Sequence, residues 1–395
     1  MGNLCCFFSY MTSIANIVDA VRNPFCIWRT LRGIEPLCCD GKHRYVVGNA
    51  AVTFFVRHNG ESKVLKCYTR THKNLGIIYG SDFHSRELCI ADLTGRKVWI
   101  DCLLTKFIEG TTLDNLLKEE LSADTLHSIA TVFDRMARQL LSSPRAHGDL
   151  KPENIVVAPD FQSMQAIDWD AAYLPQLSGE QANEIGTAAY QHPARTMEMY
   201  DKHIDDYSIA AISTLLHAAS IEANVLEYYR NNFEPPFSPR LITRRQTKQI
   251  DPIIDAFARR GMAAQYHIAK MLTSPIPRLF QLQTILELTA EPSPKPIENK
   301  QELQADEMNG LWGCRSSKGW VVAPLFDSAF DPSEGVMLVT LGAYKHFIDL
   351  DSRPLVTFSK ETIVKPFRNG KTTISQPNGT NYTLNLYQIL HNSNK

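Results

Sequence analysis

The sequence predicts an α+β fold, with a strand-rich lobe first, a helix-rich lobe second and a small all-β region last. Short runs rich in β-branched and aromatic residues fill residues 41–108, whereas residues 109–290 show mainly the 3.6-residue period of helices. Residues 291–300 hold three prolines, which disfavour helices and central strands, so we expect a linker over 291–305. Short strands and turns resume over 306–395.

The composition is typical of a folded globular protein. The chain has 395 residues, of which 44% are hydrophobic, and this length allows roughly two to three domains. Lys and Arg total 41 and Asp and Glu total 42, so no basic excess favours nucleic acid as a partner. No run of 18 apolar residues occurs, and we expect no stable membrane insertion. The nine cysteines contain no Cys-x-x-Cys pair, which favours reduced thiols and a cytoplasmic location.

Residues 1–40 form an N-terminal extension. Its first residues are only faintly similar to an acylation signal, because Cys6 occupies the place where Ser or Thr is required. Either Met1 or Met11 can be the start of the protein. Further on, apolar residues at helical spacing predict an amphipathic helix that docks on the following lobe; they are Ile14, Ile17, Val18 and Val21.

Individual elements follow from local patterns. In the first lobe we predict strands over 44–47, 52–57, 63–68 and 98–105, a helix over about 82–93, and a hairpin turn at Asn59-Gly60. In the second lobe we predict helices over 122–142, 203–221 and 251–272. Gly261 weakens the last of these helices. In the final region, strands near 319–324, 335–340 and 346–349 alternate with turns at Asn369-Gly370 and Asn378-Gly379.

The strongest chemical signal is the run His147-Gly148-Asp149-Leu150-Lys151-Pro152-Glu153-Asn154. Phosphoryl transfer from ATP requires a carboxylate to receive the acceptor proton, together with groups that hold metal ions and phosphates in line. Asp149 fits the first role, Asn154 can ligate a metal five residues later, and Lys151 can meet the transferring phosphoryl group. Nineteen residues after Asp149, Asp168 ends a short apolar run and is placed to bind magnesium.

These two motifs at this separation resemble the protein kinase family, and more narrowly a bacterial kinase-like branch. The resemblance covers about residues 30–290 and implies a bilobal protein kinase-like fold, with ATP and Mg²⁺ as cofactors. It also implies a Ser/Thr hydroxyl on a protein as the acceptor. The chain is therefore expected to be a Ser/Thr-type protein kinase.

The resemblance assigns further roles residue by residue. Lys66 would contact the nucleotide phosphates, and Glu87 on the predicted helix would pair with it. Thr105 would be the gatekeeper, and backbone groups of Lys106 and Ile108 would meet the adenine. Three further residues complete the set, with Thr187 bridging Asp149 and Lys151, Asp205 supporting the catalytic loop, and Gly48 approaching the phosphates.

The sequence departs from the kinase pattern at three places. Gly48 is the only glycine of the phosphate-binding loop, so the backbone can approach the phosphates less closely and the affinity for nucleotide is expected to be reduced. Gly148 replaces the arginine that commonly precedes the catalytic aspartate, so we expect activity without phosphorylation of an activation loop. Asp170 stands where the family has glycine, and a carboxylate there can stiffen the segment.

Two alternatives to a protein kinase stay open. Gly148 and the run Ile167-Asp168-Trp169 are also similar to small-molecule kinases of the aminoglycoside phosphotransferase type. The sparse glycine loop fits a pseudokinase scaffold that presents the C-terminal β region to a protein partner. That region resembles the bacterial tryptophan-glycine repeat, with a degenerate second copy 34 residues after the first, and we expect Trp312 and Trp320 in its core.

Overall fold

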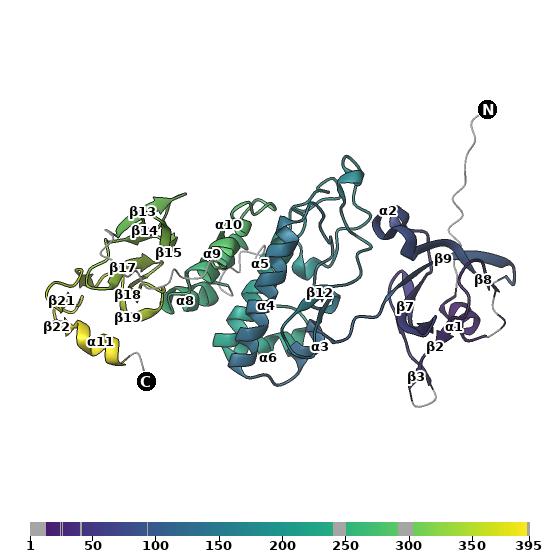
Figure 1. Cartoon of the computed structure of the whole chain (residues 1–395), viewed down its shortest axis with the longest axis horizontal. Helices are drawn as coiled ribbons and strands as arrows, with labels where there is room; N and C mark the ends of the chain where they lie inside the picture. The colour runs from purple at the N-terminus through teal and green to yellow at the C-terminus, as the bar shows by residue number, and fades with distance from the viewer. Residues whose placement is uncertain are drawn as a thin grey trace.

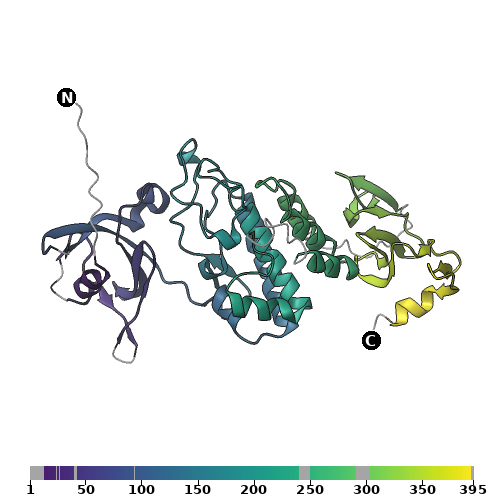
Figure 2. The ribbon, with the colours of Figure 1, turned by 180° about the vertical axis from the view of Figure 1, so that it is seen from behind.

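The computed structural model describes residues 13–392 apart from 24, 26, 40–41, 93, 240–249 and 291–302. Three parts follow one another along the long axis, namely an antiparallel sheet, a helical region and a group of small β-sheets (Figures 1 and 2). The α+β class expected from the sequence is confirmed in this order of parts. The predicted start of the chain and most of the predicted linker lie outside the described residues. A short basic run in the helix-rich lobe, for which a solvated helix face or docking of an acidic substrate can be expected from the sequence, also lies outside them; it consists of Arg240, Arg244, Arg245 and Lys248.

The N-terminal sheet is antiparallel and has the order β1-β8-β9-β7-β6-β2, with β5 also paired to β6. Its strands are β1 (Ile27–Trp28), β2 (Glu35–Pro36), β5 (Tyr45–Val47), β6 (Ala51–His58), β7 (Glu61–Tyr68), β8 (Phe83–Ala91) and β9 (Lys97–Lys106). A separate two-stranded ladder joins β3 (Cys38–Cys39) to β4 (Lys42–His43). The hairpin predicted at Asn59-Gly60 joins β6 to β7, and both turn residues have positive φ, as that turn type requires.

One face of the sheet buries its own apolar cluster. Alternate residues of β6 and β7, among them Phe54 and Leu65, are fully buried in it. Helix α1 (Ile14–Arg22) adds Ile17, Val18 and Val21 to the same cluster. The predicted docking of an amphipathic helix on the first lobe is therefore confirmed.

The helix predicted over 82–93 is wrong. Residues 83–91 form strand β8, which pairs with β9 and β1, and the chain before it forms only the short helix α2 (Leu75–Tyr79) and a 3-10 turn at Gly80–Asp82. Leu88 and Ile90 reach the sheet core at strand spacing, and pairing with β9, and for Leu88 also with β1, gives their backbone groups partners. Tertiary pairing thus overrides the local helical pattern.

The helical region is built around α5 (Asp206–Ile221), which is buried over most of its length. It packs against α4 (Ala123–Ser142), and the other helices are α3 (Leu113–Lys118), α6 (Ala223–Asn232), α8 (Asp251–Arg259), α9 (Ala263–Met271) and α10 (Gln281–Leu288). The predicted helix over 251–272 is interrupted at Gly261, whose φ of 67° places it in the left-handed region. A small sheet of β10 (Thr111–Thr112), β11 (Ile155–Val157) and β12 (Met164–Ala166) lies beside these helices.

Over its described residues the C-terminal region is nearly all β, as predicted, and forms three sheets. The first holds β13 (Gln304–Met308), β14 (Leu311–Ser316) and β15 (Gly319–Phe326); the second holds β16 (Ser328–Ala329), β17 (Val336–Leu341), β18 (Tyr344–Asp349) and β19 (Pro354–Ser359). The third holds β20 (Ile363–Val364), β21 (Lys371–Ser375) and β22 (Asn381–Asn385), and α11 (Leu386–Asn392) follows. The prediction that Trp312 and Trp320 form the core is wrong, because both are only partly buried and Cys314, Val322 and Phe326 occupy the core instead.

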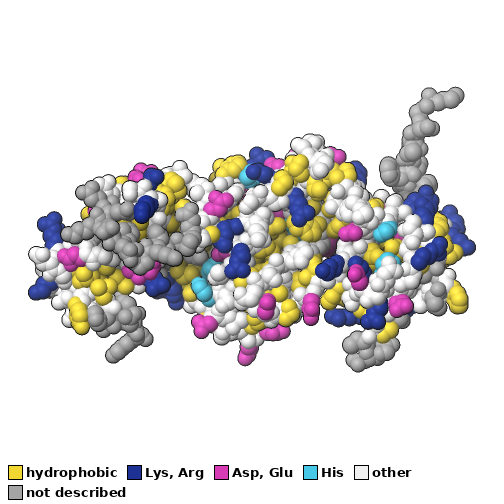
Figure 3. Space-filling model, in the orientation of Figure 1, with side chains coloured by type: hydrophobic (Ala, Val, Ile, Leu, Met, Phe, Trp, Pro, Cys, Tyr) yellow, Lys and Arg dark blue, Asp and Glu magenta, His cyan; other side chains and the backbone are white. Residues whose placement is uncertain are grey.

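None of the described helices combines the length and the apolar character needed to cross a bilayer. On the face shown in Figure 3, acidic and basic side chains are interspersed over the central part, and Lys and Arg are more frequent over the N-terminal sheet.

Candidate active site

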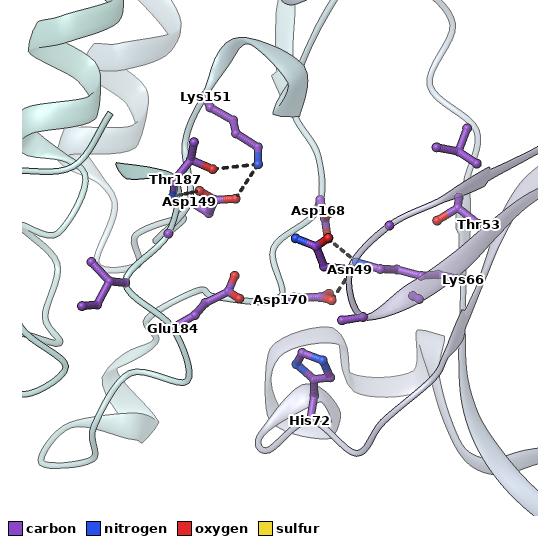
Figure 4. A pocket seen from close by; sticks show the side chains of 16 residues that line it. Asn49, Thr53, Lys66, His72, Asp149, Lys151, Asp168, Asp170, Glu184 and Thr187 are labelled. Carbon is purple, nitrogen blue, oxygen red and sulfur yellow. Dashed lines mark hydrogen bonds and ion pairs between the residues drawn. The ribbon is translucent and has the colours of Figure 1, made fainter. Parts of the chain in front are cut away.

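A cavity of about 590 Å³ lies where the N-terminal sheet faces the helical region. The sheet contributes the loop between β5 and β6 and the end of β7, whereas the helical region contributes three loops (Figure 4). The residues that line the cavity are Val46, Gly48, Asn49, Ala50, Ala51, Thr53, Lys66, His72, Asp149, Lys151, Asp168, Asp170, Glu184, Ile185, Gly186 and Thr187. Six of the predicted site residues are thus brought to one cavity, from segments far apart in the sequence.

The loop between α4 and β11 carries Asp149. Its Oδ1 accepts a hydrogen bond of 2.6 Å from the backbone N–H of Thr187, and its Oδ2 lies 3.1 Å from Nζ of Lys151. The side-chain amide of Asn154 donates to the backbone oxygen of Asp149 at 2.9 Å and reaches Oδ2 at 3.4 Å. Three neighbours therefore hold the Asp149 carboxylate in one orientation at the cavity wall.

Thr187 also contacts Asp149 and Lys151, but through two different groups rather than through its hydroxyl alone. Its hydroxyl accepts a bond of 2.8 Å from Lys151, as expected, but its backbone N–H rather than its hydroxyl contacts Asp149. Lys151 consequently lies between Asp149 and Thr187, with its ammonium directed into the cavity wall (Figure 4).

Asp205 supports this loop from below, as predicted. One of its carboxylate oxygens accepts the backbone N–H of Gly148 at 2.8 Å, and the other accepts the backbone N–H of His147. Gly148 has a φ of +85°, and a Cβ there would lie 2.2 Å from the backbone oxygen of Ala171. The position therefore has no room for any side chain, including the arginine that the kinase pattern commonly has.

Asp168 follows β12 and has a φ of 64°, an unusual value for a residue that is not glycine. The backbone of the preceding residue, Ile167, is hydrogen-bonded at both groups. Its N–H donates to the backbone oxygen of Asn154 at 2.9 Å, and its own backbone oxygen lies 2.7 Å from Nε2 of His147. These bonds fix the segment in its strained conformation. The Asp168 side chain is 43% exposed and lines the cavity.

Lys66 comes from β7 and meets two carboxylates across the cavity. Its Nζ lies 2.5 Å from Oδ1 of Asp168 and 2.7 Å from Oδ2 of Asp170 (Figure 4). The other oxygen of Asp170 accepts hydroxyl bonds of 3.0 Å from Tyr68 and 2.7 Å from Tyr79. Burial acts to lower the pKa of Lys66, but the two carboxylates outweigh burial and raise this pKa. Lys66 is therefore held as an ammonium.

The predicted pairing of Glu87 with Lys66 is contradicted. Glu87 lies in β8, where its carboxylate accepts bonds of 2.7 Å from the backbone N–H groups of Thr30 and Leu31 and one of 2.6 Å from the Thr30 hydroxyl. Burial acts to raise the pKa of Glu87, but these bonds outweigh it and lower the pKa. The strand conformation directs this carboxylate to the segment after β1, so it stabilises the sheet edge and is not part of the cavity.

The predicted adenine contacts are not brought into this cavity. Lys106 is the last residue of β9 and pairs with Lys63 of β7, and neither Lys106 nor Ile108 is among the lining residues. The same is true of Thr105. Gly48, in contrast, lines the cavity, and its N–H donates to the oxygen of Ala51 in the tight turn between β5 and β6.

Several lining residues carried no motif in the sequence. Glu184 is the clearest case, because burial and the nearby charges of Asp149 and Asp168 raise the pKa of its carboxyl group. His72 follows β7, and burial lowers its pKa. Asn49 and Thr53 belong to the β5–β6 hairpin. Only folding places these side chains together, since each lies in a segment without a recognisable spacing.

The oxygen donors of the cavity suit a hard cation whose remaining ligands come from phosphate. Asp168 offers an exposed carboxylate that lines the cavity. Asn154 is buried beside Asp149 and is not among the lining residues; its side-chain nitrogen is directed to Asp149, so its side-chain oxygen is the atom that would ligate a cation. Among the described residues, no group of three or more His, Cys, Asp or Glu side chains is arranged to hold a metal by itself. No family model matches this chain, and no curated protein matches it in sequence.

Proposed function

We propose that this protein is an ATP- and Mg²⁺-dependent phosphotransferase of the protein kinase-like type, with Asp149 as the base. The observation that carries the proposal is the convergence of Lys66, Asp149, Lys151 and Asp168 on one cavity from three separate segments. Phosphoryl transfer requires positioning and charge stabilisation more than covalent chemistry, and this set supplies both signs of charge.

The arrangement of elements supports a bilobal kinase-like fold. Lys66 lies on β7, the central strand of a run β5-β6-β7-β9-β8, and Asp149 and Asp168 lie on loops that flank β11 and β12. The two lobes meet at the cavity, so a triphosphate held by the sheet would face the carboxylates of the helical region. Magnesium would neutralise phosphate charge, with Asp168 and Asn154 as its protein ligands.

Each group that lines the cavity would have a separate role in phosphoryl transfer. Lys66 would bind the phosphates, and Gly48 with its neighbours Ala50 and Ala51 would let backbone N–H groups approach them. Transfer would form a bond from the acceptor oxygen to the γ-phosphorus and break the γ-phosphorus bond to the leaving oxygen. Asp149 would receive the acceptor proton, and Lys151 would stabilise the charge on the transferred group.

The favoured acceptor is a Ser or Thr hydroxyl on a protein. The bond of 2.8 Å from Lys151 to the Thr187 hydroxyl supports it, because the resemblance to Ser/Thr kinases implies such a threonine beside the catalytic lysine. A small-molecule acceptor is the alternative. The observation that favours it is the lack of space for any side chain at Gly148, which removes the usual arginine partner of a phosphorylated loop. This same lack of space supports activity without such phosphorylation.

The test is transfer of the labelled γ-phosphate of ATP in the presence of Mg²⁺ by the full chain and by Asp149→Asn. The variant keeps the shape of the side chain but removes its basicity, so the rate of transfer should fall by about 10²–10⁴-fold. Asp351→Asn, in an exposed turn of the C-terminal region, is the matched control and should leave the rate unchanged.

Equilibrium binding of ATP by calorimetry completes the experiment. Binding should persist in Asp149→Asn, since the carboxylate acts on the acceptor. Transfer to added small molecules but not to protein would contradict the protein acceptor and support the small-molecule acceptor. Binding without transfer in the unaltered chain would refute the enzyme and favour a pseudokinase scaffold.

A further inference from the structure

The ion pairs of Lys66 raise the question of which carboxylate orients this lysine once the nucleotide is bound. Asp168 and Asp170 both contact its Nζ, at 2.5 and 2.7 Å. They differ in exposure, since 43% of the Asp168 side chain is accessible against 11% for Asp170. The exposed carboxylate is available to a cation in the cavity, whereas the buried one is enclosed by protein.

Asp170 has all of its contacts within the protein. Oδ2 accepts from Lys66, and Oδ1 accepts from the hydroxyl groups of Tyr68 and Tyr79. Tyr68 ends β7 two residues after Lys66, and Tyr79 ends α2, so two side chains of the N-terminal sheet and one of α2 converge on one carboxylate of the helical region. A buried carboxylate with three donors is held in one position, because losing any donor would leave a charged acceptor poorly satisfied.

Among the described residues of α2 and β8 in the N-terminal part, no carboxylate contacts Lys66. The described segment from 73 to 82 holds α2, which spans only five residues, and its one acidic residue, Asp82, is exposed. Glu87 is committed to Thr30 and Leu31.

We propose that Asp170 is the positioning residue that orients Lys66 toward the nucleotide phosphates, with Tyr68 and Tyr79 fixing Asp170 in place. The inference rests on the proposed function, in which Lys66 binds the phosphates and Asp168 turns to the metal. Asp170 then keeps Lys66 in place when Asp168 is engaged. Because Asp170 is two residues from Asp168, the position of the lysine is coupled directly to the metal-binding segment and requires no movement of a long helix.

A second set of contacts keeps the two lobes together on the same side. The Asn74 side-chain amide donates to a Glu180 carboxylate oxygen at 2.7 Å, and Asn183 donates to the backbone oxygen of Lys73 at 3.0 Å. These bonds join the segment before α2 to the loop that follows Asp170. They hold Tyr79 close to Asp170, which is what the positioning role requires.

The test uses Asp170→Asn, Tyr79→Phe and Glu87→Gln in the full chain, each checked for folding by circular dichroism. The first readout is the pH dependence of acetylation of Lys66 by trace acetic anhydride, followed by mass spectrometry without nucleotide. Asp170→Asn should move the midpoint for Lys66 to lower pH, because one of its two anionic partners is lost. Glu87→Gln should leave the midpoint where it is.

The second readout is steady-state transfer. Asp170→Asn should lower kcat/KM for ATP by about 10–100-fold, as expected for loss of a charge-assisted bond, and Tyr79→Phe should lower it less. An unchanged labelling midpoint in Asp170→Asn, or a larger loss of kcat/KM in Glu87→Gln than in Asp170→Asn, would overturn the proposal. Acetylation of Lys66 does not depend on phosphoryl transfer. If the unaltered chain shows no transfer but Asp170→Asn still shifts the labelling midpoint, the proposed enzyme activity is refuted while the role of Asp170 in holding Lys66 is supported.

Discussion

Gly148 illustrates how one residue fixes the geometry of the candidate site. Its N–H donates to Asp205, its φ is +85°, and a Cβ would lie 2.2 Å from the Ala171 oxygen. The backbone of the loop that carries Asp149 therefore packs directly against the segment that follows Asp170. Asp149 comes next in the chain, so its direction depends on the conformation that Gly148 permits.

We predict that Gly148→Ala lowers the free energy of unfolding by about 3 kcal/mol, from a left-handed backbone cost of roughly 1–2 kcal/mol and a similar cost of overpacking. Urea denaturation measures this change. Gly179→Ala is the matched control, because Gly179 has a φ of +88° with no atom within 4 Å of a Cβ, and only the backbone cost applies. Equal losses in the two variants would contradict the collision with Ala171.

The residues that sequence reasoning placed in the site belong to motifs with fixed spacing. Asp149, Lys151 and Asp168 were recognisable because a short loop and a strand end constrain where they point. Glu184 and His72 were not, because their segments have no such spacing and are positioned by contacts between distant parts of the chain. The prediction for Glu87 is wrong because Lys66 pairs with Asp170 instead. Asp170 lies on a loop that approaches β7 only in the folded protein, so its spacing in the sequence does not reveal the pair.

At the scale of elements, local sequence patterns likewise predict helices and hairpins better than strands whose partners are distant in the sequence. The hairpin at Asn59-Gly60 and the helices α4 and α5 were predictable from local turn chemistry and periodicity. Strand β8 was not, since its partners β1 and β9 come from segments before and after it, and its bulge near Arg86 disturbs the alternating pattern. Burial at Trp312 and Trp320 was also mispredicted, because a repeat pattern does not specify which of its faces the helical region covers.

Strand β18 meets the helical region through a histidine whose protonation is linked to folding. His346 is fully buried, its Nδ1 lies 2.9 Å from the Thr357 hydroxyl, and burial lowers its pKa to about 4. The unfolded chain binds a proton at this residue below about pH 6.5, whereas the folded chain does so only below about pH 4. Stability from this residue is therefore present above pH 6.5 and is lost as the pH falls toward 4.

We predict that His346 accounts for a loss of about 2 kcal/mol in the free energy of unfolding between pH 7.5 and pH 5. Urea denaturation at both pH values measures the loss. His346→Asn keeps a polar atom near Thr357 but cannot take up a proton, so its loss over this range should be smaller by that amount. Asp206, whose pKa burial raises to about 6, acts in the opposite direction in both proteins and cancels in the comparison. Parallel pH profiles would contradict the role of His346.

At the scale of the whole molecule, the helical region and the C-terminal sheets share one apolar core. Phe257 and Ile268 of the helices lie in the same buried cluster as Val322 and Phe326 of β15. Polar contacts reinforce this junction, since the Tyr344 hydroxyl lies 3.0 Å from both carboxylate oxygens of Asp255 and the Leu325 oxygen lies 2.9 Å from Nε2 of His267. The N-terminal sheet instead buries a separate cluster of its own.

This division of the core predicts two cooperative units rather than three. Because the helical region and the C-terminal sheets lose the same buried surface on unfolding, their amides should become exposed together, and those of the N-terminal sheet should do so separately at lower denaturant. Hydrogen exchange with mass spectrometry across a urea series distinguishes these events, with peptides from α9, β15 and β6 as reporters. Exposure of β15 before α9 would mean that the C-terminal sheets are an independent module. ATP with Mg²⁺ should delay exposure of β6 if the cavity binds nucleotide, since a ligand that bridges the sheet and the helical region stabilises only the closed form.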